Sequence, residues 1–179
     1  MKQPAVRTGS PVAGPSTGGR LAELYLRHAD GAIRLAYLLT GDRSLAEDLV
    51  QDAFVRLAGR LRHIRDPAAF EAYLRRTVVN LSRMHFRHAR VERAYLERQP
   101  AAGVEGEPDP DVALREAVRQ ALLGLPERQR AALVLRFYAG LPDGEIADVL
   151  RCRRATVRSL VFRGLEALRG QMGSEGDED

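Results

Sequence analysis

The residues with the clearest chemical potential are arginines gathered near the C-terminus. Five arginines and no acidic residue lie between Arg151 and Arg163. A guanidinium group is a planar fork of donors that fits phosphate groups and the major-groove edge of guanine. The segment therefore predicts contact with a nucleic acid.

The surrounding sequence, GEIADVLRCRRATVRSLVFRGLEAL, has the apolar spacing of a helix-turn-helix. Small or aliphatic residues form one inner face on each predicted helix, namely Ile146, Ala147 and Leu150, then Val157, Leu160 and Val161. The second helix then begins with Arg153, Arg154, Thr156 and Arg158, where a recognition helix presents its base-reading side chains. A helical hairpin with a solvated basic face would give the same pattern.

A second basic stretch, from Glu71 to Arg98, carries seven arginines and three acidic residues. Aromatic rings among cations suit unstacked single-stranded bases. Tyr73 and Asn80 are the candidates for base contact, because Phe70, Leu74, Val78 and Leu81 recur at core spacing. His85 and His88 lack a further ligand nearby, so no metal site is predicted.

The segment SLAEDLVQDAFVRLAGRL has two faces. One is a core stripe of Leu45, Leu49, Ala53 and Leu57. The other is polar and acidic and consists of Asp48, Gln51, Asp52 and Val55. This second face could dock on a basic partner helix, and an ordinary solvated face has the same composition.

Composition narrows the classes of protein further. Among 179 residues there are 28 basic ones, all arginine except Lys2, and the formal net charge is +4. The single cysteine, Cys152, permits neither an internal disulfide nor a cysteine zinc site, which favours the cytoplasm. There is no apolar run of membrane-spanning length, no nucleophile–base set and no glycine-rich phosphate loop, so we expect neither membrane insertion, nor an enzyme, nor a cofactor.

The fold class predicted is all-α, with two small helical domains joined by a flexible acidic linker. The expected layout is a disordered lead at 1–18, a first domain at 19–96, a linker at 97–112, a second domain at 113–170 and an acidic tail at 171–179. Predicted helices span about 20–39, 44–60, 67–95, 111–123, 127–139, 143–150 and 154–169.

Four segments together resemble one family. AEDLVQDAFVRL, AYLRRTVVNLSR, LPERQRAALVLRFYAGLPDGEIADVL and ATVRSLVFRGLEALR are similar to extracytoplasmic-function (ECF) RNA polymerase sigma factors, and most to the actinobacterial SigE-like branch. The resemblance covers about residues 20–170 in family order.

The resemblance implies promoter DNA and core RNA polymerase as partners, with an anti-sigma factor in many relatives. Asp48, Gln51, Asp52 and Val55 would dock on the clamp helices of the largest subunit, and the polymerase flap would also be contacted. The minus-ten element would be opened and read by Arg62, Arg65, Asp66, Tyr73, Arg76, Asn80, Arg83 and Arg87. The minus-thirty-five element would be read by Arg153, Arg154, Thr156, Arg158, Ser159, Phe162 and Arg163.

Four positions depart from the family pattern. Pro142 stands where relatives often have a Ser or Thr N-cap, with Asp143 as a substitute. Arg151 stands where glycine is usual, and a left-handed conformation there would cost about 1–2 kcal/mol. Leu160 replaces a polar or basic residue, and Gly164 weakens the helix by about 1 kcal/mol relative to alanine.

Two alternatives remain open on the residues themselves. The chain could be a stand-alone helix-turn-helix regulator whose first domain senses a ligand or dimerises, or, more remotely, a metal-dependent hydrolase. Cys152, flanked by arginines, could be a redox switch, whereas a small residue packed between two helices explains it more simply.

Overall fold

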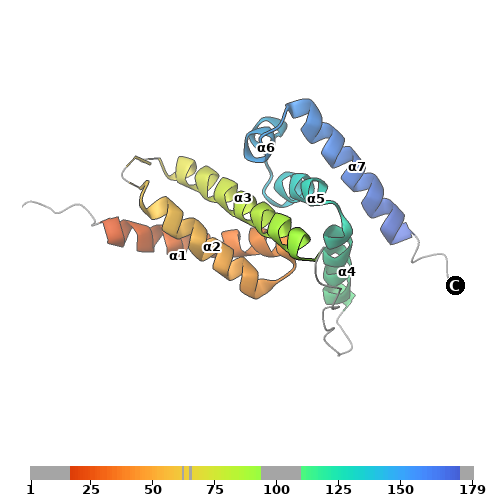
Figure 1. Ribbon diagram of the computed structural model, residues 1–179, viewed down its shortest axis with the longest axis horizontal. Helices are drawn as coiled ribbons and strands as arrows, with labels where there is room; N and C mark the ends of the chain where they lie inside the picture. The colour runs from red at the N-terminus through yellow and green to blue at the C-terminus, as the bar shows by residue number, and fades with distance from the viewer. Residues whose placement is uncertain (1–16, 62, 65, 94–109, 174–179) are drawn as a thin grey trace, which may run out of the picture.

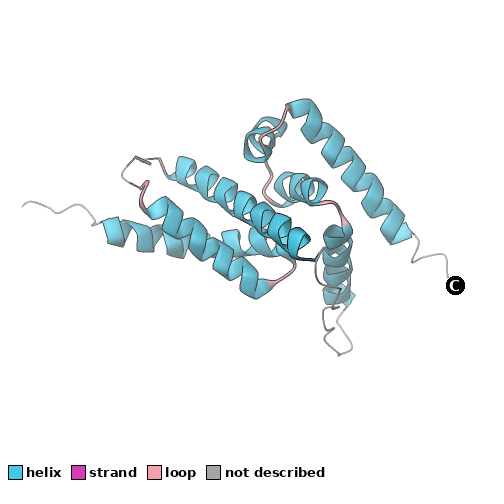
Figure 2. Cartoon of the chain, viewed as in Figure 1, coloured by secondary structure: helices cyan, strands magenta, loops and turns pink. Residues whose placement is uncertain are grey.

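The computed structural model describes residues 17–61, 63–64, 66–93 and 110–173, and within these ranges every regular element is a helix (Figures 1 and 2). The prediction of an all-α fold is confirmed. The helices form two bundles that lie against each other.

The first bundle contains α1 (Thr17–Thr40), α2 (Arg43–Ala58) and α3 (Pro67–Arg93). Asp42 caps α2 by accepting a hydrogen bond from the Leu45 amide at 3.0 Å. The predicted stripes of α2 and α3 are buried except for Leu45, which is partly buried and packs against the core, and Phe54 and Phe70 are in ring contact. The core thereby fixes which faces of α2 and α3 point outward.

A loop links α2 to α3, and Arg20 of α1 holds it in place. The Arg20 guanidinium donates hydrogen bonds to the carbonyls of Leu61 at 3.3 Å and Ile64 at 2.5 Å. These bonds tie Leu61 and Ile64 to α1. Arg62 and Arg65, both predicted to contact DNA, lie outside the described residues.

The second bundle contains α4 (Pro110–Gly124), α5 (Glu127–Leu133), a π-helical turn η1 (Val134–Tyr138), α6 (Asp143–Leu150) and α7 (Arg154–Gly173). α4 starts within the stretch expected as a linker, and α7 runs past residue 170. The helix expected over 127–139 ends instead in the π-helical turn. Residues 97–109 of the expected linker are outside the described part of the chain.

Gly164 lets α7 pack closely on α5. A Cβ atom at Gly164 would lie 2.8 Å from Leu133 Cδ1 and 3.1 Å from its Cγ, and Leu133 is itself buried. Gly164 lowers the helix propensity of α7, but it leaves room for the Leu133 side chain where α7 packs on α5.

Two arginines of the second bundle bind backbone carbonyls at the end of α1. Arg130, which is 7% exposed, donates to the Leu39 carbonyl at 2.5 Å and stacks on the Phe86 ring. Arg119 donates to the Gly41 carbonyl at 3.1 Å. Both bundles therefore share an interface built on α1 and α3 (Figure 1).

Candidate nucleic-acid interface

The pair α6 and α7 forms the predicted helix-turn-helix. Ile146, Ala147, Leu150 and Val157 are buried, and Leu160 and Val161 pack against the same core. Cys152 is half-buried against that core, and its amide donates to the Ala147 carbonyl at 3.0 Å, which closes α6. The packing interpretation of Cys152 is consistent with this position.

Arg151 forms the turn between the two helices in a left-handed conformation, with φ 49° and ψ 58°. It is the one non-glycine residue with positive φ among the residues described. The strain expected for such a residue is about 1–2 kcal/mol. The left-handed conformation considered for Arg151 is therefore present.

The start of α7 presents its polar and basic face to solvent. The seven residues predicted to read DNA are all exposed: Arg153, Arg154, Thr156, Arg158, Ser159, Phe162 and Arg163. The large apolar side chain of Phe162 is 60% exposed. This face is therefore accessible to a partner.

Asp143 restrains one of these residues. Its carboxylate accepts from Arg158 Nε at 3.2 Å and also pairs with Arg136. Pro142 makes no side-chain capping bond at the start of α6. Asp143 therefore links η1, α6 and α7.

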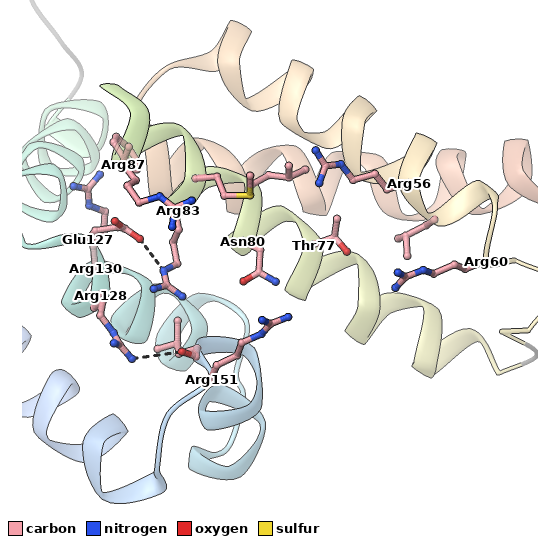
Figure 3. Close-up of a pocket in the computed structure, with 15 residues that line it drawn as sticks. Arg56, Arg60, Thr77, Asn80, Arg83, Arg87, Glu127, Arg128, Arg130 and Arg151 are labelled. Carbon is pink, nitrogen blue, oxygen red and sulfur yellow. Dashed lines mark hydrogen bonds and ion pairs between the residues drawn. The ribbon is translucent and has the colours of Figure 1, made fainter. Parts of the chain in front are cut away.

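The predicted minus-ten residues of α3 fall into two environments. Tyr73 is exposed at 45%, and Arg76 is half-buried. Asn80, Arg83 and Arg87 line a cleft between the bundles (Figure 3). Asp66, the remaining described member, is exposed and its carboxylate accepts from the Ala68 amide at 3.0 Å, which caps α3 just before Pro67.

The cleft has a volume of about 1320 Å³ and runs between α2 and α3 on one side and α5 and α6 on the other. Arginine side chains line both walls (Figure 3). Across it, Arg83 Nε lies 2.8 Å from the Glu127 carboxylate. A predicted DNA-contacting residue is thus engaged with the second bundle.

Arg130 anchors the same interface from the inside. Besides the Leu39 carbonyl, its guanidinium donates to the carbonyls of Leu123 at 3.1 Å and Leu125 at 3.2 Å. Burial lowers the pKa of Arg130, although an arginine remains protonated in proteins. Sequence reasoning missed this residue; its position beside the apolar run AALVL was the available signal.

Arg119 anchors the far end of the interface. It lies over the Tyr37 ring at 5.5 Å and pairs with Glu116 on its own helix. Hydrogen bonds from Arg119 and then Gln120 lower the pKa of Glu116 to about 2. The pair therefore stays ionised at neutral pH.

The acidic face of α2 is separate from the core of the first bundle. Asp48, Gln51, Asp52 and Val55 are all exposed, and Val55 keeps 73% of its surface. Val55 follows Asp52 by one helical turn, so this face combines two carboxylates with an exposed aliphatic side chain.

Among the described residues, no group of three or more His, Cys, Asp or Glu side chains could hold a metal ion. None of the described helices combines the length and the apolar character needed to cross a bilayer.

Two family descriptions match the chain in order. Sigma-70 region 2 matches residues 24–91, and Sigma-70, region 4 matches residues 115–168. These ranges correspond to the first and second bundles. A stand-alone regulator would have a first domain that senses a ligand or dimerises, whereas the first bundle of this chain matches Sigma-70 region 2.

Individual sigma factors are also similar to this chain in sequence. The chain is 35% identical over 181 residues to the ECF RNA polymerase sigma factor SigE of Mycolicibacterium smegmatis, covering 96% of this chain and 67% of the relative. It is 33% identical to the RNA polymerase sigma-E factor of Streptomyces avermitilis, with 85% of each chain covered.

Solved structures share the fold. The sigma factor RpoE of Bartonella quintana, crystallised with the anti-sigma factor NepR, has a TM-score of 0.68 at 21% identity and covers 86% of this chain and 97% of its own. CnrH, in complex with the cytosolic domain of CnrY, has a TM-score of 0.61 at 24% identity, covering 86% and 88%. With two regions in order and relatives of this similarity, the chain belongs to the ECF RNA polymerase sigma factors.

Proposed function

We propose that this sigma factor binds core RNA polymerase through α2, opens and reads the minus-ten element with α3, and reads the minus-thirty-five element with α7. The single observation that carries the proposal is the exposed basic face of α7 on a helix-turn-helix, in a chain whose first bundle matches region 2. Promoter recognition is thereby divided between two rigid helices.

Polymerase docking is assigned to Asp48, Gln51, Asp52 and Val55. Their exposure supports contact with the basic clamp helices of the largest subunit. Opposite charges on two surfaces steer encounter and fix register, even where each pair adds little affinity. The flap is the expected second contact on the polymerase.

Minus-ten recognition is assigned to Tyr73, Arg76, Asn80, Arg83 and Arg87, with Arg62 and Arg65 from the preceding loop. Unstacked bases would lie on the Tyr73 ring while arginines hold the phosphates. Asp66 is assigned to the same site, and its carboxylate also caps α3. The Arg83–Glu127 ion pair engages Arg83 Nε and would compete with DNA for this guanidinium.

Minus-thirty-five recognition is assigned to Arg153, Arg154, Thr156, Arg158, Ser159, Phe162 and Arg163. Arginines on the first turns would bind guanine edges in the major groove, and the later ones would bind phosphate. Nothing in the described part of the chain covers this face, so duplex DNA could reach it and replace the Arg158–Asp143 ion pair.

The location, mode of action and further partner of the chain are those expected of a sigma factor. The chain acts in the cytoplasm as a dissociable subunit without catalysis or cofactor, and the domains at 19–96 and 113–170 act in concert. The structural relatives RpoE and CnrH were solved with NepR and with the cytosolic domain of CnrY. An anti-sigma factor is accordingly a partner to be sought.

Co-purification tests the docking step. The full chain, mixed with purified core polymerase and passed over a sizing column, is expected to elute with it at a one-to-one ratio. A stand-alone regulator would elute separately and would still bind DNA, and that result would refute the proposed function.

A further inference from the structure

The cleft between the bundles is strongly basic. Seven arginines line it and Glu127 is its one acidic residue. They come from α2, the turn after α2, α3, α5 and the turn between α6 and α7, and they are Arg56, Arg60, Arg83, Arg87, Arg128, Arg130 and Arg151. Figure 3 shows their side chains on both walls of the space.

Only some of these charges have partners. Arg83 pairs with Glu127, while Arg128 and Arg130 donate to backbone carbonyls. The other four, Arg56, Arg60, Arg87 and Arg151, form none of the ion pairs found among the described residues. All four are exposed, so their unpaired charges are open to solvent and to a ligand in the cleft.

Such an arrangement favours an anion with several charges. A cleft lined by one sign of charge between protein walls focuses the potential and attracts counter-ions. Several guanidinium groups spread along a cleft match successive phosphate groups better than a single carboxylate. Thr77 and Asn80 add neutral hydrogen-bonding groups on the α3 wall.

We propose that this cleft binds a short linear polyphosphate, either inorganic or carried by a nucleoside, which bridges the two bundles and holds them closed. Binding itself concerns only the free chain. The consequence rests on the proposed function: the ligand would occupy the space in front of Asn80, Arg83 and Arg87 and so compete with the minus-ten strand.

Titration calorimetry on the full chain tests the site, with tripolyphosphate and GTP as separate probes and sulfate at matched ionic strength as the reference. Two double variants remove cleft arginines from one wall each: Arg56→Gln with Arg60→Gln, and Arg128→Gln with Arg151→Gly. The glycine also relieves the left-handed strain at position 151. The matched control, Arg115→Gln with Arg169→Gln, removes two exposed arginines that do not line the cleft.

We expect tripolyphosphate or GTP to bind, each cleft variant to weaken binding at least tenfold, and the control to change it less than twofold. Equal binding of the two probes assigns recognition to the phosphate chain, and tighter binding of GTP adds the nucleoside. The proposal is overturned if neither tripolyphosphate nor GTP binds better than sulfate. A single-stranded oligonucleotide is tested in the same way, and binding of the oligonucleotide alone would also overturn it. It is also overturned if the control loses as much affinity, or if only one wall matters.

Inhibition of initiation is a separate measurement. If the ligand binds the free chain as expected but leaves promoter opening unchanged, the site stands and its competition with the minus-ten strand is refuted. If the chain fails to support initiation at all, the proposed function fails and the calorimetry is unaffected.

Discussion

Arg158 is held in the free protein by an ion pair that DNA can readily replace. Its Nε lies 3.2 Å from Asp143 Oδ2, and its side chain is 74% exposed. Exposed pairs of this kind contribute about 0–1 kcal/mol. Asp143 therefore orients Arg158 at the start of the recognition helix without locking it.

Arg154 and Arg158 lie one turn apart and are expected to read bases, whereas Arg163 lies further along α7 and is expected to hold phosphate. Changing Arg154 or Arg158 to Ala should relax preference at one upstream position, by about 1–3 kcal/mol of discrimination. Arg163→Ala should weaken all sequences alike and lower the salt slope by about one.

Selection of upstream sequences by each variant holoenzyme over a salt series measures this. The assignment of α7 as the reader would be wrong if all three variants selected the parental sequence with parental strength.

At the scale of the element, the packing of α7 on α5 depends on Gly164. Gly164→Ala gains about 1 kcal/mol of helix propensity. Against this, it forces a methyl group onto buried Leu133, and overpacking of a core costs about 1–3 kcal/mol. We expect a net loss of stability of about 1 kcal/mol.

Gly170 of the same helix is the matched control, because a Cβ atom at this position would meet no atom of another element within 4 Å. Gly170→Ala should stabilise the chain by up to about 1 kcal/mol. Urea unfolding compares the two variants, and equal stabilisation by both would show that Gly164 has no packing role.

The exposed face of α2 makes a second prediction at this scale. Asp48→Arg with Asp52→Arg replaces attraction to a basic polymerase helix with repulsion and should weaken core binding at least tenfold. The fold should persist because both residues are exposed. Unaltered core affinity with an intact fold would remove α2 as the docking face.

The helices of both bundles could be predicted from the sequence because their apolar residues recur at local, helical spacing. The stripes of α2 and α3 and the inner faces of α6 and α7 were identified in this way. The π-helical turn at 134–138 was not predicted, since its apolar pattern continues that of α5. Asp66 was predicted to contact DNA. Its cap on α3 was not predicted, because the cap depends on backbone geometry.

The cleft and its arginines could not be predicted, because they depend on contacts between residues distant in the chain. Arg130 bonds to Leu39 across 91 positions, and Arg83 meets Glu127 across 44. No periodicity encodes such a pairing. The roles of Arg56, Arg60 and Arg151 become visible only once the two bundles are placed together.

At the scale of the whole molecule, the closed arrangement covers the α3 face more than the α7 face. Arg83–Glu127 is the one ion pair that joins the two bundles within the described residues. Glu127→Gln removes it and adds to the excess positive charge of the cleft. We expect the equilibrium between joined and separated bundles to shift toward the separated state by about 1 kcal/mol.

Small-angle scattering of the free chain measures this as a larger radius of gyration. Glu145→Gln is the control, because Glu145 is exposed and carries the same charge without lining the cleft. A radius identical in both variants and in the parent would show that the ion pair does not hold the bundles together.

The central claim is that this chain directs core polymerase to promoters, and transcription in vitro tests it most directly. Purified chain, core polymerase and double-stranded genomic fragments are combined, and the 5′ ends of the transcripts are mapped. We predict chain-dependent start sites that share one minus-ten and one minus-thirty-five sequence, and loss of these transcripts with Tyr73→Ala, since base stacking on an aromatic ring contributes about 1–3 kcal/mol. Transcripts that are the same with and without the chain would contradict the account.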